Sequence, residues 1–476
     1  MLGQHMESKT KQLLRNLPSV DVLLAADELQ PYIPPLGRKT VTEAVRRSIE
    51  AAREQLLSEA PKDLDEAELR KLIIADTEHR LTTLSEPFYG RVVNATGIIL
   101  HTALGRAVLS ARVLKQIQQT LGGYSLLQAD RETGKRSNRD ERIEWLLQQL
   151  TGAEAATVVN NNAAATAIVL NTVAEGREVI VSRGQLVEIG GSFRLPDVMA
   201  FSGAKLVEVG TTNKTHPRDY EQAITENTAA ILRVHPSNYK IQGFSSEAPL
   251  DVLVKIAHDN DLVMIDDVGA GSLIDFSQFG FEPEPTLPQS VGSGADIITS
   301  SADKLIGASQ CGIILGRKRL IDAVRKNQFA RIVRVGKLTL AALEATLKLF
   351  LDQTVALQEV PTLRMLRRSG KEIRKHAERL AKEIQSKSKA GAVTTIDGFS
   401  QMGSGSLPTQ NLATTLVAIE HAKISAEAFA KRLRLSNPPV FTRIANERVL
   451  IDPRTLLDGD DEIVVSAVAK ISADGD

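Results

Sequence analysis

A lysine and two neighbouring aspartates are the residues of this sequence best suited to covalent catalysis. Lys304 lies in a turn of small residues between two apolar segments, 296–300 and 311–315. A desolvated lysine loses its proton readily, and its neutral amine forms a Schiff base with an aldehyde such as pyridoxal phosphate. Asp266 and Asp267 end another apolar run, and a carboxylate there would keep the pyridine nitrogen of that cofactor protonated. The alternative is a surface lysine on a tight turn.

A run of three asparagines, 160–162, follows a third apolar segment and precedes an alanine-rich helix. Asparagine caps helices, and the free amides of the first helical turn bind phosphate when no bulky side chain covers them. A capped core helix without a ligand remains the alternative. The Gly-Ala-Gly turn at 269–271 lacks the third glycine of a dinucleotide-binding motif, so dinucleotide binding is a weak rival.

The elements that must position these residues form an α/β pattern. Seven short apolar segments are predicted as strands: 157–159, 178–181, 205–209, 229–234, 262–265, 296–300 and 311–315. Helix-length segments separate most of them, which predicts a mainly parallel seven-stranded sheet covered on both faces. Ligands of such sheets bind beyond the carboxyl ends of the strands, where the asparagines, the aspartates and Lys304 all lie.

Composition excludes several classes of protein. The 476 residues carry 58 basic and 58 acidic side chains, so no net field attracts nucleic acid, and any such partner requires a local patch. A single cysteine, Cys311, excludes a disulfide framework and a cysteine-clustered metal site, and it fits a reducing cytosol. The chain has neither an apolar run of membrane-spanning length nor a signal-peptide pattern at its start, so we expect a cytoplasmic protein.

Residues 1–85 are predicted to be helical and separate from the α/β region. Apolar and charged residues alternate at helical spacing from Thr42 to Leu57, and prolines 31, 34 and 35 punctuate the preceding stretch. Several basic residues of this region could form a phosphate-binding face: Arg38, Lys39, Arg46, Arg47 and Arg53. Acidic residues are about as numerous, which favours a solvated amphipathic face on sequence alone.

The amino-acid sequences of several motifs resemble those of bacterial selenocysteine synthases, the L-seryl-tRNA(Sec) selenium transferases. The motifs are the segments 91–107, 159–165, 181–191, 209–213 and 235–244 and the Lys304 turn, and the resemblance extends from Leu17 to Ile444. It implies a fold type I pyridoxal-phosphate-dependent transferase. The expected domains are a helical tRNA-binding domain with its linker (1–85), a large cofactor-binding α/β domain (86–344) and a small α+β carboxyl-terminal domain (345–476).

The function implied by the resemblance is conversion of L-seryl-tRNA(Sec) to L-selenocysteinyl-tRNA(Sec). Selenophosphate would donate selenium to a cofactor-bound dehydroalanyl (aminoacrylyl) intermediate, in a ring-like homo-oligomer, by family likeness a homodecamer. By the same resemblance, Lys304 is the Schiff-base lysine and Asp267 the partner of the pyridine nitrogen, with no metal. Further cofactor contacts are Asn161, Asn162, Ala163 and Ser301, and the selenophosphate-binding residues are Arg106, Arg331 and Arg334. The spacing of Arg331 and Arg334 predicts one face of a helical turn.

Departures and alternatives remain. The turn reads Ser301-Ala-Asp-Lys and is followed by Gly307-Ala-Ser-Gln, where the family usually has Ser-Gly-Asp-Lys and Gly-Gly-Pro-Gln. A pyridoxal-phosphate lyase or transferase for free small amino acids is the alternative function, and a tRNA-binding protein without activity is a third. A helical amino-terminal domain argues against the lyase, and the presence of Lys304 argues against the inactive binder. The roles of Cys311, His101 and Arg443 stay open; we favour structural roles for Cys311 and His101.

Overall fold

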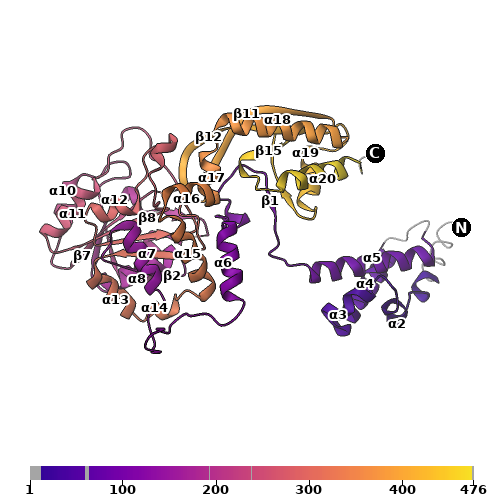
Figure 1. The fold of residues 1–476 in the computed structure, drawn as a ribbon, viewed down its shortest axis with the longest axis horizontal. Coiled ribbons are helices and arrows are strands. Elements are labelled where there is room, and N and C mark those ends of the chain that lie inside the picture. The colour runs from indigo at the N-terminus through magenta and orange to yellow at the C-terminus, as the bar shows by residue number, and fades with distance from the viewer. Residues whose placement is uncertain (1–11, 59–63, 192, 237, 474–476) are drawn as a thin grey trace. The chain divides into compact units, whose positions relative to one another are not determined.

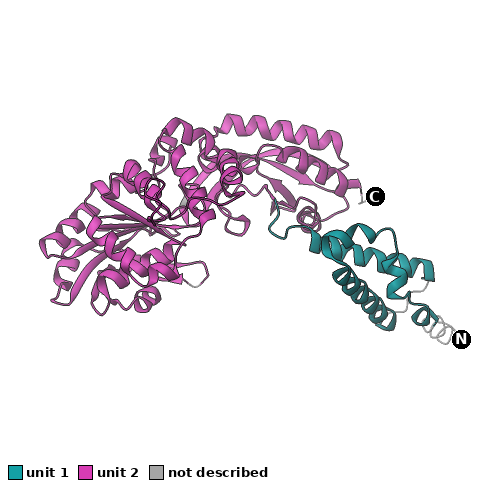
Figure 2. Cartoon of the chain, turned by 60° about the horizontal axis from the view of Figure 1, so that its bottom comes forward, with its two compact units in different colours: residues 1–91 teal, residues 92–476 magenta. Residues whose placement is uncertain are grey.

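The computed structural model describes residues 12–58, 64–191, 193–236 and 238–473, which form two compact units, 1–91 and 92–476 (Figure 2). Ser237 of the 235–244 motif and the outer ends of the first and last predicted domains lie outside the described residues. Each unit is described by itself.

The first unit is a small helical bundle. Its main elements are α2 (Val20–Leu24), η1 (Gln30–Tyr32), α3 (Ile33–Leu36), α4 (Arg38–Ser58) and α5 (Glu66–Ser85). Asp65 caps α5 in a capping box with Glu68, which fixes where that helix begins. Leu29, Val45 and Leu81 are fully buried between the helices. The apolar stripe thus faces the core, and the basic residues of α4 are left on the outside.

The second unit contains the predicted seven-stranded sheet, in the order β2-β10-β9-β8-β7-β3-β6 (Figure 1). The strands are β2 (Ala155–Val159), β3 (Glu178–Ser182), β6 (Lys205–Val209), β7 (Thr228–Val234), β8 (Val263–Gly269), β9 (Ile297–Ser301) and β10 (Gly312–Gly316). Neighbours pair in parallel except β10, which is antiparallel to β9 and β2. The fold-class prediction is confirmed.

Helices cover both faces of this sheet because successive strand residues point to opposite sides. In β3, Ile180 joins one core, which also holds residues of α7 (Glu141–Thr151), α11 (Leu250–Asp259) and α15 (Lys337–Leu349). Val179 and Val181 join the other core, with residues of α8 (Asn162–Ala174), α9 (Leu195–Phe201) and α13 (Lys318–Lys326). The remaining elements up to residue 332 are η2 (Thr102–Leu104), α6 (Ala111–Leu121), η3 (Arg183–Gln185), β4 (Glu188–Ile189), β5 (Phe193–Arg194), α10 (Pro217–Ala223), η4 (Phe276–Phe279), α12 (Leu287–Gly292) and α14 (Phe329–Ile332).

A second sheet, in the order β11-β12-β15-β14, lies in the carboxyl-terminal part. Its strands are β11 (Ala392–Gly403), β12 (Ser406–Glu420), β14 (Arg443–Ala445) and β15 (Arg448–Ile451), and a short parallel pair joins β1 (Val93–Asn94) to β13 (Val440–Phe441). The helices here are α16 (Gln353–Glu359), α17 (Pro361–Arg367), α18 (Gly370–Lys387), α19 (Ala426–Arg434), η5 (Pro453–Thr455) and α20 (Asp460–Ala473). The expected boundary at 344/345 falls inside α15, whose buried residues belong to the large core, so we propose that the small domain begins after α17.

None of the helices in the described residues is both long enough and apolar enough to cross a membrane.

Candidate active site

Lys304 lies in the turn between β9 and β10, and its side chain is buried, with 7% of the residue exposed. Burial lowers the pKa of Lys304, and the positive charge of Arg106 lowers it further, while Asp267 and Asp303 act in the opposite direction. The amine is therefore easier to deprotonate than an exposed lysine. The predicted Schiff-base role of Lys304 requires such a desolvated amine with a carboxylate nearby.

Asp267 lies near the end of β8, inside the strand and not in the glycine-rich turn after it. Asn162 Nδ2 donates to one carboxylate oxygen at 2.9 Å, and Thr166 Oγ1 donates to the other at 3.0 Å. Burial nevertheless raises the pKa of Asp267. A cation placed against this carboxylate would relieve that cost, as a protonated pyridine nitrogen does.

The neighbouring Asp266 has a structural role because its side chain points to the opposite face of the strand. It is fully buried and paired with Arg233 at 2.8 Å and Ser290 Oγ at 2.7 Å. Of the two aspartates left open by the sequence, only Asp267 lies among the other predicted site residues.

The asparagine turn is built as a helix start. Asn161 caps α8, and its Oδ1 accepts from the amide of Ala164 at 2.9 Å. The amides of Asn162 and Ala163 precede the first intrahelical bonds, which leaves them suited to a phosphate. Gly312 of β10 permits the close approach of the next strand, since a Cβ there would lie 2.2 Å from the carbonyl oxygen of Asn161. The side chain of Asn162 faces Asp267, so only its backbone is suited to the phosphate.

Arg106 contacts the Lys304 turn although it lies 197 residues before Asp303 in the sequence. Its Nη1 lies 2.8 Å from Oδ2 of Asp303, whose Oδ1 accepts from Ser301 Oγ at 2.7 Å. Arg106 has φ 62° directly after Gly105, so the chain turns sharply where this side chain is presented. Ser301 therefore contacts Asp303 through its hydroxyl. Asp303 itself had no predicted role.

Arg331 and Arg334 lie beside the asparagine turn and not, by any described contact, beside Lys304. The amide of Asn160 donates to the carbonyl of Val333 at 2.9 Å. The prediction that both arginines share a helical turn is wrong. Helix α14 ends at Ile332, so Arg334 lies beyond it; the carbonyl of Val333, which a longer helix would use, accepts instead from the amide of Asn160.

A third arginine, Arg139, completes this basic group. Its Nη1 donates to the carbonyl of Val335 at 2.8 Å, and its pKa is lowered by burial and by the nearby charge of Arg334, with smaller effects from Arg136 and Arg331. An anion bound beside Arg139 would offset the positive charges gathered there. Neither Arg139 nor Thr166 was predicted from the sequence as a site residue. The spacing of Thr166 four residues after Asn162 would have placed both side chains on one helix face.

The three residues left open have separate surroundings. Cys311 is fully buried, and burial raises the pKa of its thiol, which makes it a poor nucleophile. His101 is half-buried, and burial lowers the pKa of its ring; its Nδ1 has no hydrogen-bond partner within the described part of the chain. Arg443 is held by Asp452 at 3.1 Å and by the carbonyl of Phe399 at 2.9 Å.

A separate cavity of about 540 Å³ lies between α17, α18 and the segment from η5 to α20. It is lined by many cations, but most already have partners: Arg364 pairs with Asp458, Arg379 pairs with Asp461, and Arg368 donates to His376. Its charges are largely balanced, so the cavity is not an evident anion site. Among the described residues no group of three or more His, Cys, Asp or Glu could hold a metal ion.

Comparison with known proteins decides the family. The model of the family described as L-seryl-tRNA selenium transferase matches residues 92–457, and the one described as selenocysteine synthase N terminal matches residues 14–53. The chain belongs to the L-seryl-tRNA selenium transferase family. A relative of that name from Clostridium botulinum (strain Okra / Type B1) is 43% identical over 461 residues, which cover 97% of this chain and 99% of the relative. One from Clostridium perfringens (strain ATCC 13124) is 44% identical over 462 residues, with the same coverage.

The fold also resembles a solved structure, that of D-glucosaminate-6-phosphate ammonia-lyase. The TM-score is 0.56 at 22% identity, and the match covers 81% of this chain and 96% of the other. At this identity the likeness concerns the fold alone.

Pyridoxal 5'-phosphate is the cofactor of the selenium transferase family, and the residues present fit it. Lys304 supplies a desolvated amine, Asp267 a buried carboxylate that forms no salt bridge with the other described residues, and the start of α8 two amides for the phosphate. The site also contains a buried polar atom that could accept a hydrogen bond from the cofactor. Asn162 Oδ1, on the side chain that donates to Asp267, is buried without a hydrogen-bond partner among the described residues.

Proposed function

We propose that this enzyme converts L-seryl-tRNA(Sec) to L-selenocysteinyl-tRNA(Sec), the step of selenocysteine biosynthesis in which selenium replaces the serine hydroxyl oxygen. Selenophosphate supplies the selenium and phosphate is released. The observation that carries the proposal is the buried Lys304 beside Asp267 and Arg106, in a chain that matches the family model from residue 92 to residue 457.

The side chains around Lys304 have distinct tasks in this proposal. When bound, pyridoxal phosphate acts as an electron sink that acidifies the α-proton of the seryl group and lets the β-hydroxyl leave. Lys304 holds the cofactor through its Nζ and moves the α-proton. Asp267 keeps a proton on the pyridine nitrogen, and the amides of Asn162 and Ala163 bind the phosphate. Burial of these groups excludes water, which strengthens each electrostatic contact.

Arg106 is proposed to bind the selenium donor together with Arg331 and Arg334. A guanidinium is always charged and matches the oxygens of a phosphate-like anion. Arg106 is occupied by Asp303 at 2.8 Å, so an incoming anion would share or replace that carboxylate. Arg331 and Arg334 lie beside the asparagine turn, and Arg139 lies close enough for their charges to act on its pKa.

The amino-terminal unit is proposed to bind the tRNA. A groove of about 1310 Å³ between α4 and α5 is lined by six basic side chains and by Glu43 and Asp76. The basic residues are Arg38, Lys39, Arg46, Arg47, His79 and Arg80. Arg47 and Arg80 pair with Glu43 and Asp76 along their helices, and the other four have no ion-pair partner in the described residues. Such a surface suits the phosphates of RNA, which lie in two rows flanking a groove.

We also propose a cytoplasmic homo-oligomer, a ring-like homodecamer by resemblance to the family. Large apolar side chains lie exposed on the second unit, among them Leu114, Tyr124, Leu126, Trp145 and Leu338. Exposed apolar surface of this kind is typical of subunit contacts. Native mass spectrometry of the purified protein would measure the subunit number, and a monomer at micromolar concentration would refute the assembly.

The test of the function uses the full-length protein reconstituted with pyridoxal phosphate. With seryl-tRNA(Sec) and selenophosphate we expect selenocysteinyl-tRNA(Sec), detected after hydrolysis and alkylation by mass spectrometry. The Lys304→Ala variant should bind the tRNA but form no product. Turnover of free serine, but not of seryl-tRNA(Sec), would favour the alternative lyase or transferase of free amino acids. Binding of tRNA without turnover by the unaltered protein would refute an enzymatic role.

A further inference from the structure

The main chain of the segment that carries Arg106 is hydrogen-bonded to the carboxyl-terminal part of the chain. It starts as β1, which pairs with β13. The amides of Ile99 and Leu100 then donate to the carbonyls of Gln401 and Met402 at 3.0 and 2.7 Å. The backbone position of Arg106 relative to Lys304 therefore depends on residues far from both in sequence.

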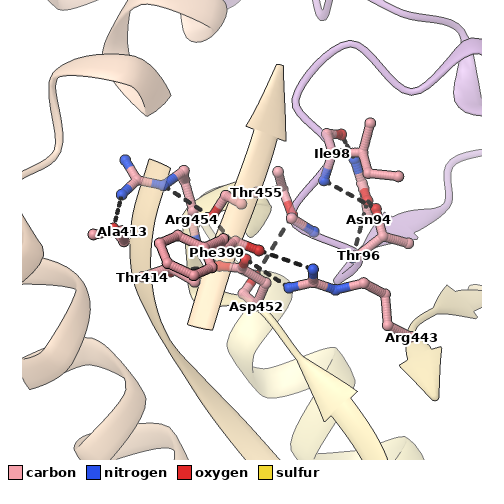
Figure 3. A network of polar contacts seen from close by, with 12 residues as sticks. Asn94, Thr96, Ile98, Phe399, Ala413, Thr414, Arg443, Asp452, Arg454 and Thr455 are labelled. Carbon is pink, nitrogen blue, oxygen red and sulfur yellow. Dashed lines mark hydrogen bonds and ion pairs between the residues drawn. The ribbon is translucent and has the colours of Figure 1, made fainter. Parts of the chain in front are cut away.

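Asp452 is the centre of this attachment (Figure 3). It is fully buried and uses both carboxylate oxygens. Its Oδ2 accepts from Ser400 Oγ at 2.7 Å and from Arg443 at 3.1 Å, and its Oδ1 accepts from Thr414 Oγ1 at 3.0 Å and from the amide of Arg454 at 3.0 Å. A buried carboxylate with four donors is held in one orientation.

Gly97 packs directly on this carboxylate. A Cβ at Gly97 would lie 2.0 Å from Asp452 Oδ2, so no other residue could approach so closely, and its φ of 75° also favours glycine. The amide of Gly97 donates to Thr455 Oγ1 at 3.0 Å, and its carbonyl accepts from the amide of Gln401 at 2.9 Å. Both the amide and the carbonyl of Gly97 are thus hydrogen-bonded to the carboxyl-terminal part of the chain.

The segment is also braced internally on its way to Arg106. Asn94 Nδ2 donates to the carbonyl of Ile98 at 2.9 Å, and its Oδ1 accepts from Thr96 Oγ1 at 2.7 Å, as Figure 3 shows. Further along, Thr102 Oγ1 and Ser404 Oγ lie 2.9 Å apart, and Ser404 Oγ also donates to the carbonyl of Leu100 at 2.5 Å. These contacts leave little freedom between Gly97 and the turn before Arg106.

Both arginines of the network make most of their hydrogen bonds within it, although Nε of Arg443 has no partner among the described residues. Arg454, with 2% of its surface exposed, donates to Ser400 Oγ and to the carbonyls of Met365, Arg368 and Ala413. Arg443 donates to Asp452 and to the carbonyl of Phe399. The guanidinium of Arg454 is therefore unavailable for a substrate, and that of Arg443 is held by two contacts, which points to a positioning role for the network.

We propose that Asp452 and Thr455 are positioning residues that hold Gly97 and thereby set the place of Arg106 beside Lys304. This inference rests on the proposed function, since it takes Arg106 as a binding residue for the selenium donor. The specific consequence is that loosening the attachment should weaken the use of selenophosphate and leave tRNA binding and the attachment of the cofactor to Lys304 unchanged. Small displacements of a positioning group are costly because binding and transition-state contacts depend on sub-ångström placement.

The main test compares Thr455→Val with Thr455→Ser in the full-length holoenzyme. Valine has the shape of threonine but cannot accept the hydrogen bond of Gly97, whereas serine keeps the hydroxyl. We expect Thr455→Val to raise KM for selenophosphate about tenfold and Thr455→Ser to stay within about twofold. The dissociation constant of seryl-tRNA(Sec) and the visible absorbance of the bound cofactor should not change in either variant.

A second variant protects the test against misfolding. Thr102 is exposed, so Thr102→Val should fold normally while it removes the contact with Ser404. We expect it to raise KM for selenophosphate in the same direction as Thr455→Val. If both variants left KM for selenophosphate unchanged, the positioning role would be overturned. It would also be overturned if both variants lowered kcat and weakened the binding of selenophosphate and of seryl-tRNA(Sec) to the same extent.

Arg106→Ala separates failure of this inference from failure of the proposed function. If Arg106→Ala leaves KM for selenophosphate unchanged, the donor-binding role of Arg106 is wrong, and the present inference fails with it. If Arg106→Ala raises that KM but Thr455→Val and Thr102→Val do not, the donor role holds and only the positioning inference fails. A rise in all three supports both.

Discussion

Asn162 Nδ2 donates to Asp267 Oδ1 across 2.9 Å and so joins the phosphate-binding turn to the carboxylate meant for the pyridine nitrogen. Two parts of the proposed cofactor site that come from different strands are thereby held at a fixed separation. Thr166, one helical turn after Asn162, donates to the other oxygen at 3.0 Å. The carboxylate of Asp267 is oriented by helix α8 as much as by its own strand.

Thr166→Val should weaken catalysis by removing one donor to a buried carboxylate. Losing such a hydrogen bond costs about 1–3 kcal/mol, so we expect kcat/KM for seryl-tRNA(Sec) to fall about tenfold or more. The acidic limb of the pH profile should move to higher pH, because the pKa of Asp267, already raised by burial, would rise further. Thr166→Ser keeps the hydroxyl and should retain activity. An unshifted profile in Thr166→Val would contradict this role.

Lys304→Met should stabilise the cofactor-free protein near neutral pH. Burial lowers the pKa of Lys304 in the folded state below the ordinary 10.5, so the unfolded chain binds more protons between the two values. Folding stability contributed by Lys304 therefore rises with pH in that window, and at lower pH its burial is a net cost. Methionine removes the cost. The gain in free energy of unfolding over the unaltered protein, measured by urea titration, should shrink as pH approaches 10.5. A gain independent of pH would contradict the pKa shift.

Gly312→Ala should disturb the asparagine turn. Its Cβ would lie 2.2 Å from the backbone oxygen of Asn161, so the start of α8 must move away from β10. We expect cofactor affinity to fall about tenfold or more, because the amides that hold the phosphate are displaced. Gly292→Ala is the matched control, since a Cβ there meets nothing within 4 Å. Cofactor titration followed by absorbance measures both, and equal affinities would show that the turn does not need this close approach.

The fold was predictable from sequence where the signal was local. The seven strands are runs of apolar residues separated by helix-length segments, and each lies within a few residues of its expected position. The two aspartates after Ile265 could not be told apart in the same way. The strand continues through both, and the alternation of its side chains sends Asp266 to Arg233 and Asp267 to the asparagine turn.

Contacts between distant segments could not be predicted from spacing. Arg106 and Asp303 are 197 residues apart, and Gly97 meets Thr455 across 358 residues. Only the family resemblance suggested that Arg106 belongs near Lys304. The spacing of Arg331 and Arg334 predicted one helical turn, but helix α14 ends between them. The carbonyl of Val333 accepts from the distant amide of Asn160 and not from a later residue of the same helix.

Cys311→Ala should leave selenium transfer within about twofold of the unaltered enzyme, because a small buried residue is replaced by one of similar character. Burial raises the pKa of the Cys311 thiol, so little thiolate is present to handle selenium near neutral pH. The same reasoning predicts that iodoacetamide does not inactivate the folded holoenzyme. Loss of turnover in a Cys311→Ala variant of normal stability would instead give this thiol a chemical role.

Arg46→Glu tests the basic groove of the amino-terminal unit. Arg46 lines the groove, and its reversal should weaken the binding of seryl-tRNA(Sec) and reduce the slope of log Kd against log salt by about one. At saturating tRNA kcat should be unchanged, because the second unit is unaltered. Arg53→Glu is the matched control on the same helix, where the side chain pairs with Glu50 and does not line the groove. Equal losses of affinity in the two variants would indicate a general effect of charge, and the groove would then not be the tRNA-binding surface.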